Sequence, residues 1–210
     1  MLNASVKYTA YAVLGLYSLL LFLFGVSVPS LMTRILSFVP MLLVICFAGF
    51  DRWAWRWPIV LKFVKRPYLA GTWWGELISY RLDEDNRKTS STHDVVLVIQ
   101  QTFTTISLTL MTAESKSRSV APEIEKEAND DFVVHYQYEN TPHLAVRETS
   151  PIHRGSAAIE VHGSSPVDLD AEYWTARKSQ GTFALKKITN KRVGSFREGQ
   201  TLATIESEVE

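Results

Sequence analysis

The hydrophobic pattern divides the chain into two unlike parts. Two uncharged, mostly apolar runs stand in tandem at the start, 26 residues at 8–33 and 16 residues at 35–50, and Arg34 is the only charge between Lys7 and Asp51. A helix of roughly 20 apolar residues crosses a hydrocarbon core of about 30 Å. The pattern predicts a two-helix transmembrane hairpin, with the shorter run completed by interfacial tryptophans that follow it. A buried core helix and a cleavable signal peptide are the alternatives, and the tandem arrangement and the length of the first run disfavour them.

The remainder of the chain alternates between apolar and polar residues with a period of two, which predicts an all-β module with one buried face. Eight strands are expected, joined by short turns that favour an up-and-down meander closing into a small β-barrel. Pro122 makes the fourth strand the least regular, because proline cannot donate to a strand ladder. The strands are predicted at 72–82, 93–101, 104–114, 117–126, 131–140, 154–162, 168–177 and 181–188.

These elements predict a membrane-anchored all-β protein with four segments. We expect a two-helix transmembrane anchor at 1–57, a basic juxtamembrane linker at 58–70, a cytosolic ligand-sensing barrel at 71–189 and a disordered polar tail at 190–210. In the barrel, Trp73 is expected to plug the interior and Trp74 to anchor the outside. The single cysteine, Cys46, lies in the second apolar run, so no disulfide can form within one chain.

Charge is distributed unevenly although the chain is neutral overall, with 22 basic and 22 acidic residues. Residues 1–70 contain seven Lys and Arg and one acid, whereas residues 71–210 contain fifteen and twenty-one. Most of the basic residues near the apolar runs follow the second run, so the positive-inside rule places both termini and the module in the cytoplasm. A module with a net charge of −6 is unsuited to DNA or RNA, which need a basic stripe along the phosphate backbone.

Polar side chains appear where the buried parity of several strands reaches one end of the barrel, at Thr112, Glu114, Asn140, His153, Thr175 and Arg177, with Gly155 at the same parity before His153. They are either solvated caps or the orienting contacts of a ligand site. Arg177 and Arg154 could bind phosphate as planar forks, and Tyr138, Tyr136 and Tyr80 could stack on bases.

Motifs of catalysis are lacking in the sequence. It has no glycine-rich phosphate loop, no His-Glu-x-x-His, no Cys-x-x-Cys and no Gly-x-Ser-x-Gly, and its five histidines fall on different predicted strands and loops. We therefore expect a binding module and not an enzyme, with no metal and no cofactor.

Several short motifs carry a resemblance to a known family. They are Gly71-Thr72-Trp73-Trp74-Gly75, Asn140-Thr141-Pro142, His153-Arg154-Gly155, Tyr173-Trp174-Thr175-Ala176-Arg177 and Gly181. With the two amino-terminal spans, they resemble the two-transmembrane, β-strand-rich effectors associated with bacterial CD-NTases in cyclic-oligonucleotide-based anti-phage signalling. The resemblance covers roughly residues 1–190.

The resemblance implies a barrel that binds a cyclic dinucleotide made by a cognate CD-NTase. Binding would promote self-association of the chains in the bacterial inner membrane, and membrane disruption would kill the infected cell. The residues expected to contact the ligand are Arg177, Thr175, Tyr173, Tyr138, Asn140, Pro142, His153 and Arg154. Arg177 and Thr175 are assigned to phosphate or ribose, Tyr138 and Asn140 to a base, and His153 and Arg154 to the opposite side of the mouth.

Two further expectations complete this interpretation. Gly155 and Gly181 are expected to serve turn geometry and not to touch the ligand. The alternative functions are a membrane-tethered, lipocalin-like carrier of an apolar molecule, favoured by the Gly-x-Trp at residues 71–73, and a passive scaffold that binds a protein partner at the barrel rim.

Overall fold

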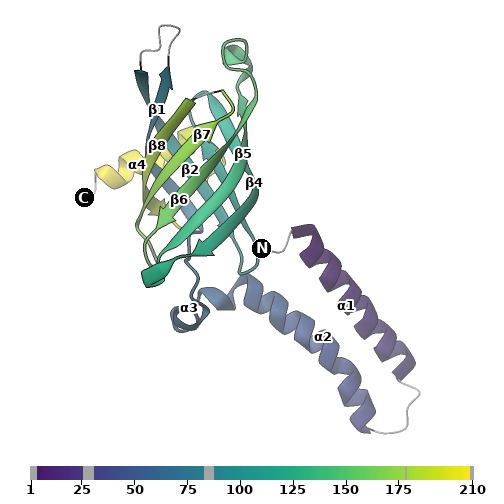
Figure 1. The fold of residues 1–210 in the computed structure, drawn as a ribbon. Helices are drawn as coiled ribbons and strands as arrows, with labels where there is room; N and C mark the ends of the chain where they lie inside the picture. The colour runs from purple at the N-terminus through teal and green to yellow at the C-terminus, as the bar shows by residue number, and fades with distance from the viewer. Residues whose placement is uncertain (1–3, 26–30, 83–87, 178, 209–210) are drawn as a thin grey trace. The chain divides into compact units, whose positions relative to one another are not determined.

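The computed structural model describes residues 4–25, 31–82, 88–177 and 179–208. These residues form two compact units (Figure 1). The first unit holds the amino-terminal helices, up to residue 64, together with residues 102–105. The second unit holds the remaining residues from 65 onward and contains every strand.

Four helical segments make up the first unit. They are α1 (Ala4–Gly25), α2 (Leu31–Arg52), the 3₁₀ turn η1 (Ala54–Arg56) and α3 (Pro58–Val64). Arg34, the charge between the two apolar runs, lies within α2, which begins at Leu31. Arginine is a good helix former, so a lone charge does not mark a helix end. Within the described residues, no helix combines the length and the apolar character that crossing a membrane requires.

A buried carboxylate organises the end of α2. Asp51 is 3% exposed, and its Oδ1 accepts hydrogen bonds from the backbone nitrogen and the hydroxyl of Thr104, at 2.9 and 2.7 Å. The ring of Phe103 packs against Phe50 and Trp55 of the same unit. Residues 102–105 therefore belong with the helices, although they join two strands of the second unit.

Eight antiparallel strands close into a barrel in simple sequence order, which confirms the predicted eight-stranded up-and-down β-barrel (Figure 1). Closure pairs the first strand with both the second and the eighth, so the sheet has no free edge. The strands are β1 (Gly71–Leu82), β2 (Lys88–Gln101), β3 (Ile106–Met111), β4 (Ser115–Lys126), β5 (Phe132–Pro142), β6 (His153–Val161), β7 (Asp168–Thr175) and β8 (Ser179–Thr189).

The irregularity expected at Pro122 is present in β4. The pairing of β4 with β5 shifts register between Val120 and Glu123, and Ala121 has a φ of +47°. This β-bulge accommodates a residue that has no N–H for the ladder.

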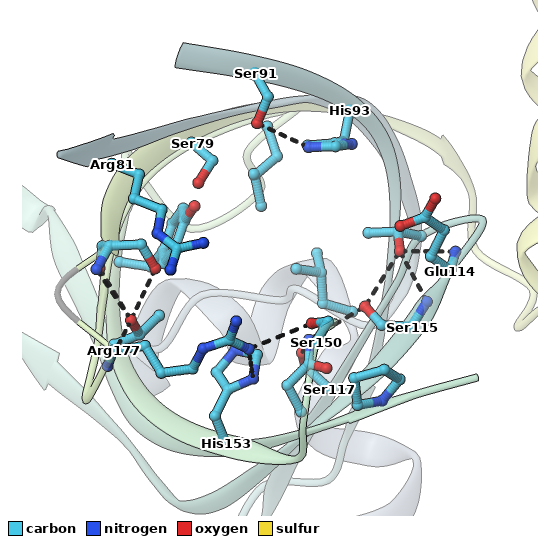
Figure 2. A pocket seen from close by; sticks show the side chains of 18 of the residues that line it. Ser79, Arg81, Ser91, His93, Glu114, Ser115, Ser117, Ser150, His153 and Arg177 are labelled. Carbon is cyan, nitrogen blue, oxygen red and sulfur yellow. Dashed lines mark hydrogen bonds between the residues drawn. The ribbon is translucent and has the colours of Figure 1, made fainter. Parts of the chain in front are cut away.

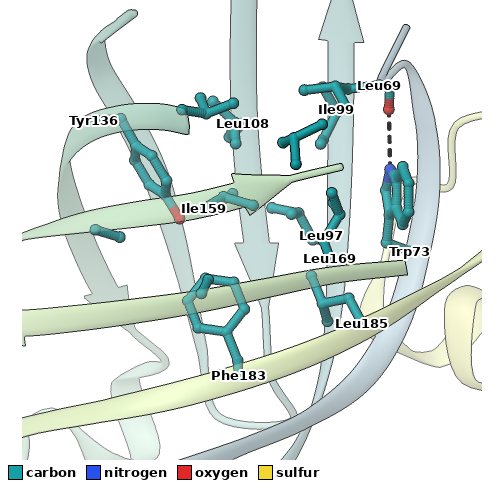
Figure 3. Packing of buried hydrophobic residues seen from close by; sticks show 14 of the residues in the cluster. Leu69, Trp73, Leu97, Ile99, Leu108, Tyr136, Ile159, Leu169, Phe183 and Leu185 are labelled. Carbon is teal, nitrogen blue, oxygen red and sulfur yellow. Dashed lines mark hydrogen bonds between the residues drawn. The ribbon is translucent and has the colours of Figure 1, made fainter. Parts of the chain in front are cut away.

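The alternating apolar residues of the strands meet inside the barrel and form its core (Figure 3). Trp73 is fully buried there, and its indole nitrogen donates to the carbonyl oxygen of Leu69 at 3.0 Å. The expected interior plug is thus confirmed. Trp74 faces outward and packs against Phe196, with ring centroids 5.8 Å apart, as expected of an outer anchor.

The expectation of a disordered tail at 190–210 is wrong for residues 190–208. They include α4 (Phe196–Ser207), which packs on the outside of the barrel. The Ser195 hydroxyl accepts from the backbone nitrogen of Glu198, and the Glu198 carboxylate accepts from that of Gly194. The Ser-x-x-Glu spacing of a capping box was visible in the sequence, but the polar composition of the segment concealed it.

Candidate functional site

One end of the barrel holds a cavity of about 480 Å³ (Figure 2). It lies where the odd-numbered strands end and the even-numbered strands begin, the rim at which polar side chains were expected to converge. Its lining combines apolar residues of the core, such as Leu77 and Phe183, with polar side chains. The structure brings together here seven of the residues assigned to the ligand: Tyr138, Asn140, Pro142, His153, Tyr173, Thr175 and Arg177.

The prediction that Arg154 lies at this mouth is wrong. Arg154 is 82% exposed on the outer wall, where its guanidinium donates twice to Glu139 Oε2 at 3.1 Å. Successive side chains of a strand point to opposite faces, so Arg154 must face outward when His153 faces the cavity. The same alternation turns Tyr80 outward, where the Lys88 ammonium lies 4.1 Å from its ring centroid.

Arg177 is held at the mouth by several polar neighbours. Its Nη1 lies within 3.3 Å of Ser150 Oγ, Pro151 O and His153 Nδ1. The Thr175 hydroxyl accepts from the backbone nitrogens of Arg177 and Ser179, at 3.1 and 3.3 Å, and lies 2.8 Å from Ser179 Oγ. In this conformation Thr175 therefore shapes the turn that presents Arg177, and its hydroxyl already has partners.

Sequence reasoning missed a second arginine in the same sector, Arg81. It lines the cavity and pairs in register with Ser179, the residue that begins β8. Figure 2 shows Arg81 and Arg177 on one side of the mouth. The alternation of β1 could have found it, because Leu77, Ser79 and Arg81 share one parity.

Next to Arg177, His153 is held in an environment that favours the neutral imidazole. Burial lowers the pKa of His153 below its ordinary value, the hydrogen bond to the Pro151 oxygen opposes this in part, and the charge of Arg177 lowers the pKa further. The Nδ1 atom lies 3.0 Å from Pro151 O and 3.2 Å from Arg177 Nη1, so it donates to the first or accepts from the second according to its tautomer. A neutral His153 leaves Arg177 as the dominant local charge.

Two tyrosines of the cavity wall, Tyr138 and Tyr173, are paired with glycines across strands. Tyr138 is the cross-strand partner of Gly155, and Tyr173 is that of Gly181. A Cβ atom at Gly155 would lie 2.4 Å from the Tyr138 hydroxyl oxygen, and one at Gly181 would lie 2.6 Å from Tyr173 Cε1. The expectation that these glycines serve turns is wrong, since both lie within strands and make room for the rings. Burial raises the pKa of both tyrosines, so their hydroxyls stay protonated and able to donate.

The opposite sector is rich in hydroxyl and carboxylate oxygens. Asn140 donates to the hydroxyls of Ser115 and Ser117, at 3.1 and 3.0 Å, and its Oδ1 is buried without a hydrogen-bond partner among the described residues. Pro142 ends β5 opposite Ser115 in the register. Glu114 lies across the mouth from the two arginines (Figure 2).

Comparison with known proteins identifies the family of this barrel. Residues 64–187, more than half of the chain, match the model of the Cap15 cyclic dinucleotide receptor domain. The chain belongs to this family. The match confirms the predicted membership among CD-NTase-associated effectors of cyclic-oligonucleotide-based anti-phage signalling.

A curated relative extends the likeness. The CD-NTase-associated protein 15 of Staphylococcus schleiferi is 26% identical over 140 residues, which span 67% of this chain and 71% of the relative. The span matched to the Cap15 receptor domain begins at the end of α3 and reaches into β8, so it contains every residue of the cavity wall.

Proposed function

We propose that the barrel mouth binds a cyclic dinucleotide made by a cognate CD-NTase, and that binding drives self-association of membrane-anchored chains and disruption of the bacterial inner membrane. The observation that carries the proposal is the cavity of a Cap15 receptor domain in which Arg81 and Arg177 share one sector. We propose binding and no reaction.

The size and chemistry of the cavity suit such a ligand. Its volume of about 480 Å³ lies in the range of small-molecule sites, roughly 300–1,000 Å³. Planar guanidinium groups recognise phosphate oxygens through paired hydrogen bonds. The rings of Tyr138 and Tyr173 supply faces on which a base can stack, and serine hydroxyls around the mouth can bond ribose.

The membrane part of the proposal is supported by the two apolar runs and by the surface of the helices they form. Large apolar side chains of α1 and α2 are exposed, among them Leu16, Leu23, Leu43 and Ile45, each at 57% or more. Apolar surface on this scale needs a cover, which a lipid bilayer supplies. The basic residues after the second run favour a cytoplasmic barrel, where a CD-NTase product would reach it.

Ligand binding can promote assembly only if the assembled state binds the ligand more tightly than the resting state does. The ligand brings two phosphate charges to a mouth that holds two arginines, and the barrel is otherwise acidic. We infer that neutralising the mouth is the step that favours assembly.

Ligand binding by the full-length chain in detergent tests the proposal. A cyclic dinucleotide should raise the melting temperature of the wild-type protein, and Arg177→Ala should weaken affinity about tenfold or more, because a hydrogen bond to a charged group contributes about 1.5–3 kcal/mol. Arg177→Lys should fall between the two, since it keeps the charge and loses the planar fork. Arg81→Ala should also weaken binding.

Arg154→Ala is the matched control, because it removes an arginine from the outer wall of the same barrel and disrupts only an exposed ion pair. Its affinity should stay within about twofold of wild type. The proposal would be contradicted if no cyclic dinucleotide bound, or if Arg154→Ala were as damaging as Arg177→Ala. A co-purified lipid whose retention ignores Arg177 would instead support the lipocalin-like carrier.

A further inference from the structure

We propose that Glu114 selects a guanine base in the ligand, an inference that rests on the proposed function. Glu114 lies in the turn between β3 and β4 and lines the cavity. In this proposal, the side of the mouth that carries Glu114 recognises one base, and the side that carries the arginines binds phosphate.

The order of strands places these two groups on opposite sides of the mouth. Arg177 lies just before β8, and Arg81 of β1 is the cross-strand partner of Ser179, the first residue of β8. Glu114 directly precedes β4, which is four strands from β8 in either direction around the closed eight-stranded barrel. Figure 2 shows the same arrangement, with Glu114 and Ser115 across the mouth from Arg81 and Arg177.

The backbone of Glu114 is fixed on both sides. Its nitrogen donates to Thr112 Oγ1 at 3.1 Å, and its carbonyl oxygen accepts from the backbone nitrogen of His143 at 2.8 Å. Ser115 is held in the same turn by its own bond to Thr112 Oγ1 at 3.0 Å. Among the described residues, the Glu114 carboxylate has neither a hydrogen bond nor an ion pair, so its acceptors are available to a ligand.

A carboxylate in a binding site for a doubly charged anion weakens binding, because like charges repel. The ligand must therefore offer the carboxylate hydrogen bonds that offset this repulsion. Guanine offers such hydrogen bonds, since its N1–H and 2-amino group are adjacent donors that match the two carboxylate oxygens. Adenine and cytosine each place a ring-nitrogen acceptor beside their amino group, and uracil places its single N–H between two carbonyl oxygens. Only guanine offers two neighbouring donors with no acceptor facing the carboxylate.

The arrangement also fits the shape of a cyclic dinucleotide. Its two phosphates belong to the central ring and its bases project outward from that ring. A phosphate held by Arg81 and Arg177 therefore leaves a base free to extend toward the wall that carries Glu114.

The test compares cyclic di-GMP, cyclic di-AMP, cyclic di-IMP and cyclic GMP–AMP on the full-length chain in detergent, by equilibrium binding. Wild-type protein should prefer each guanine-containing ligand over cyclic di-AMP by about tenfold, within the range that one bidentate base contact supports. Cyclic di-IMP lacks the 2-amino group and should bind more weakly than cyclic di-GMP. This ligand comparison needs no variant and so does not depend on a variant's folding.

Glu114→Gln should remove most of the preference, since an amide offers one donor and one acceptor and pairs with guanine no better than with adenine. Glu160→Gln is the control, because it removes an exposed carboxylate from the outward face of β6 and should leave the preference unchanged. If Glu114→Gln weakened all ligands equally, the carboxylate would bind ribose and the inference would be overturned.

The two proposals fail in different ways. Equal binding of cyclic di-GMP and cyclic di-AMP by wild-type protein would overturn the guanine inference and leave the receptor function standing. Absence of binding by every cyclic dinucleotide would overturn both.

Discussion

At the scale of single residues, the neutral imidazole of His153 beside the Arg177 guanidinium makes the folding stability depend on pH. Because burial and Arg177 lower the pKa of His153, the unfolded chain binds this proton more readily than the folded chain does. Stability contributed by neutral His153 is therefore complete above the ordinary pKa of about 6.5 and is lost as pH falls below it. Thermal melting of the ligand-free full-length chain between about pH 7.5 and 5.5 measures this.

We expect His153→Asn to have a flatter dependence of melting temperature on pH than wild type. The comparison variant is His162→Asn, which replaces a side chain that is 68% exposed and pairs with Asp131 at the surface. Equal slopes for His153→Asn and wild type would contradict the assignment of the acid sensitivity to His153.

The arginines show what residue-level reasoning could and could not predict. Arg177 was placed correctly by extending the alternation of its strand, whereas Arg154 was assigned to the mouth for its guanidinium chemistry, against the same alternation. Arg81 follows from the alternation of β1 as directly as Arg177 follows from that of β7. The tyrosine–glycine pairs could not be predicted from the sequence, because a period of two does not reveal which residues are partners across strands.

At the scale of elements, strands with one buried face were predictable and elements without one were not. Each barrel strand was expected in its place, but β2 begins at Lys88 and not near residue 93, because its first seven residues are exposed and show no alternation. The helix α4 was missed for the same reason. Its contacts with the barrel come from a few residues near its start, Val193, Phe196 and Gly199.

Gly199 of α4 packs closely on Val96 of the barrel and gives a test of that packing. A Cβ atom there would lie 2.6 Å from Val96 Cγ2 and 2.8 Å from Val96 Cγ1. Alanine should favour the helix by about 1 kcal/mol, but overpacking costs about 1–3 kcal/mol. We expect Gly199→Ala to lower the melting temperature, by up to about 8 °C, and to reduce hydrogen-exchange protection in α4.

The control for this variant is Gly194→Ala, in the same segment. The nearest atom to a Cβ there is Glu198 Oε2 at 3.6 Å, an ordinary contact. Its melting temperature should stay near that of wild type. A Gly199→Ala protein more stable than wild type would show that α4 does not pack on Val96 in solution.

At the scale of the whole molecule, charge and hydropathy predicted two parts, and contacts divide the described residues into two units. The eight-stranded barrel followed from the alternation of the strands together with the short turns that join them. The membrane hairpin stays a prediction, since apolar runs indicate a span without showing the bilayer around it. The role of the ligand depends on how the two parts are coupled.

Linkage gives the sharpest test of self-association. If cyclic dinucleotide binding favours assembly, then assembly must raise ligand affinity by the same factor, because coupling between two equilibria is reciprocal. Full-length chains reconstituted in vesicles of bacterial lipid should therefore bind cyclic dinucleotide more tightly at a high protein-to-lipid ratio than at a low one, by about 5-fold or more for a typical coupling of 1–3 kcal/mol. Release of an encapsulated dye should rise more steeply than in proportion to chain density. Arg177→Ala should suppress both effects, and Arg154→Ala should suppress neither. If ligand affinity did not depend on chain density, ligand binding would stand and assembly as its consequence would be ruled out.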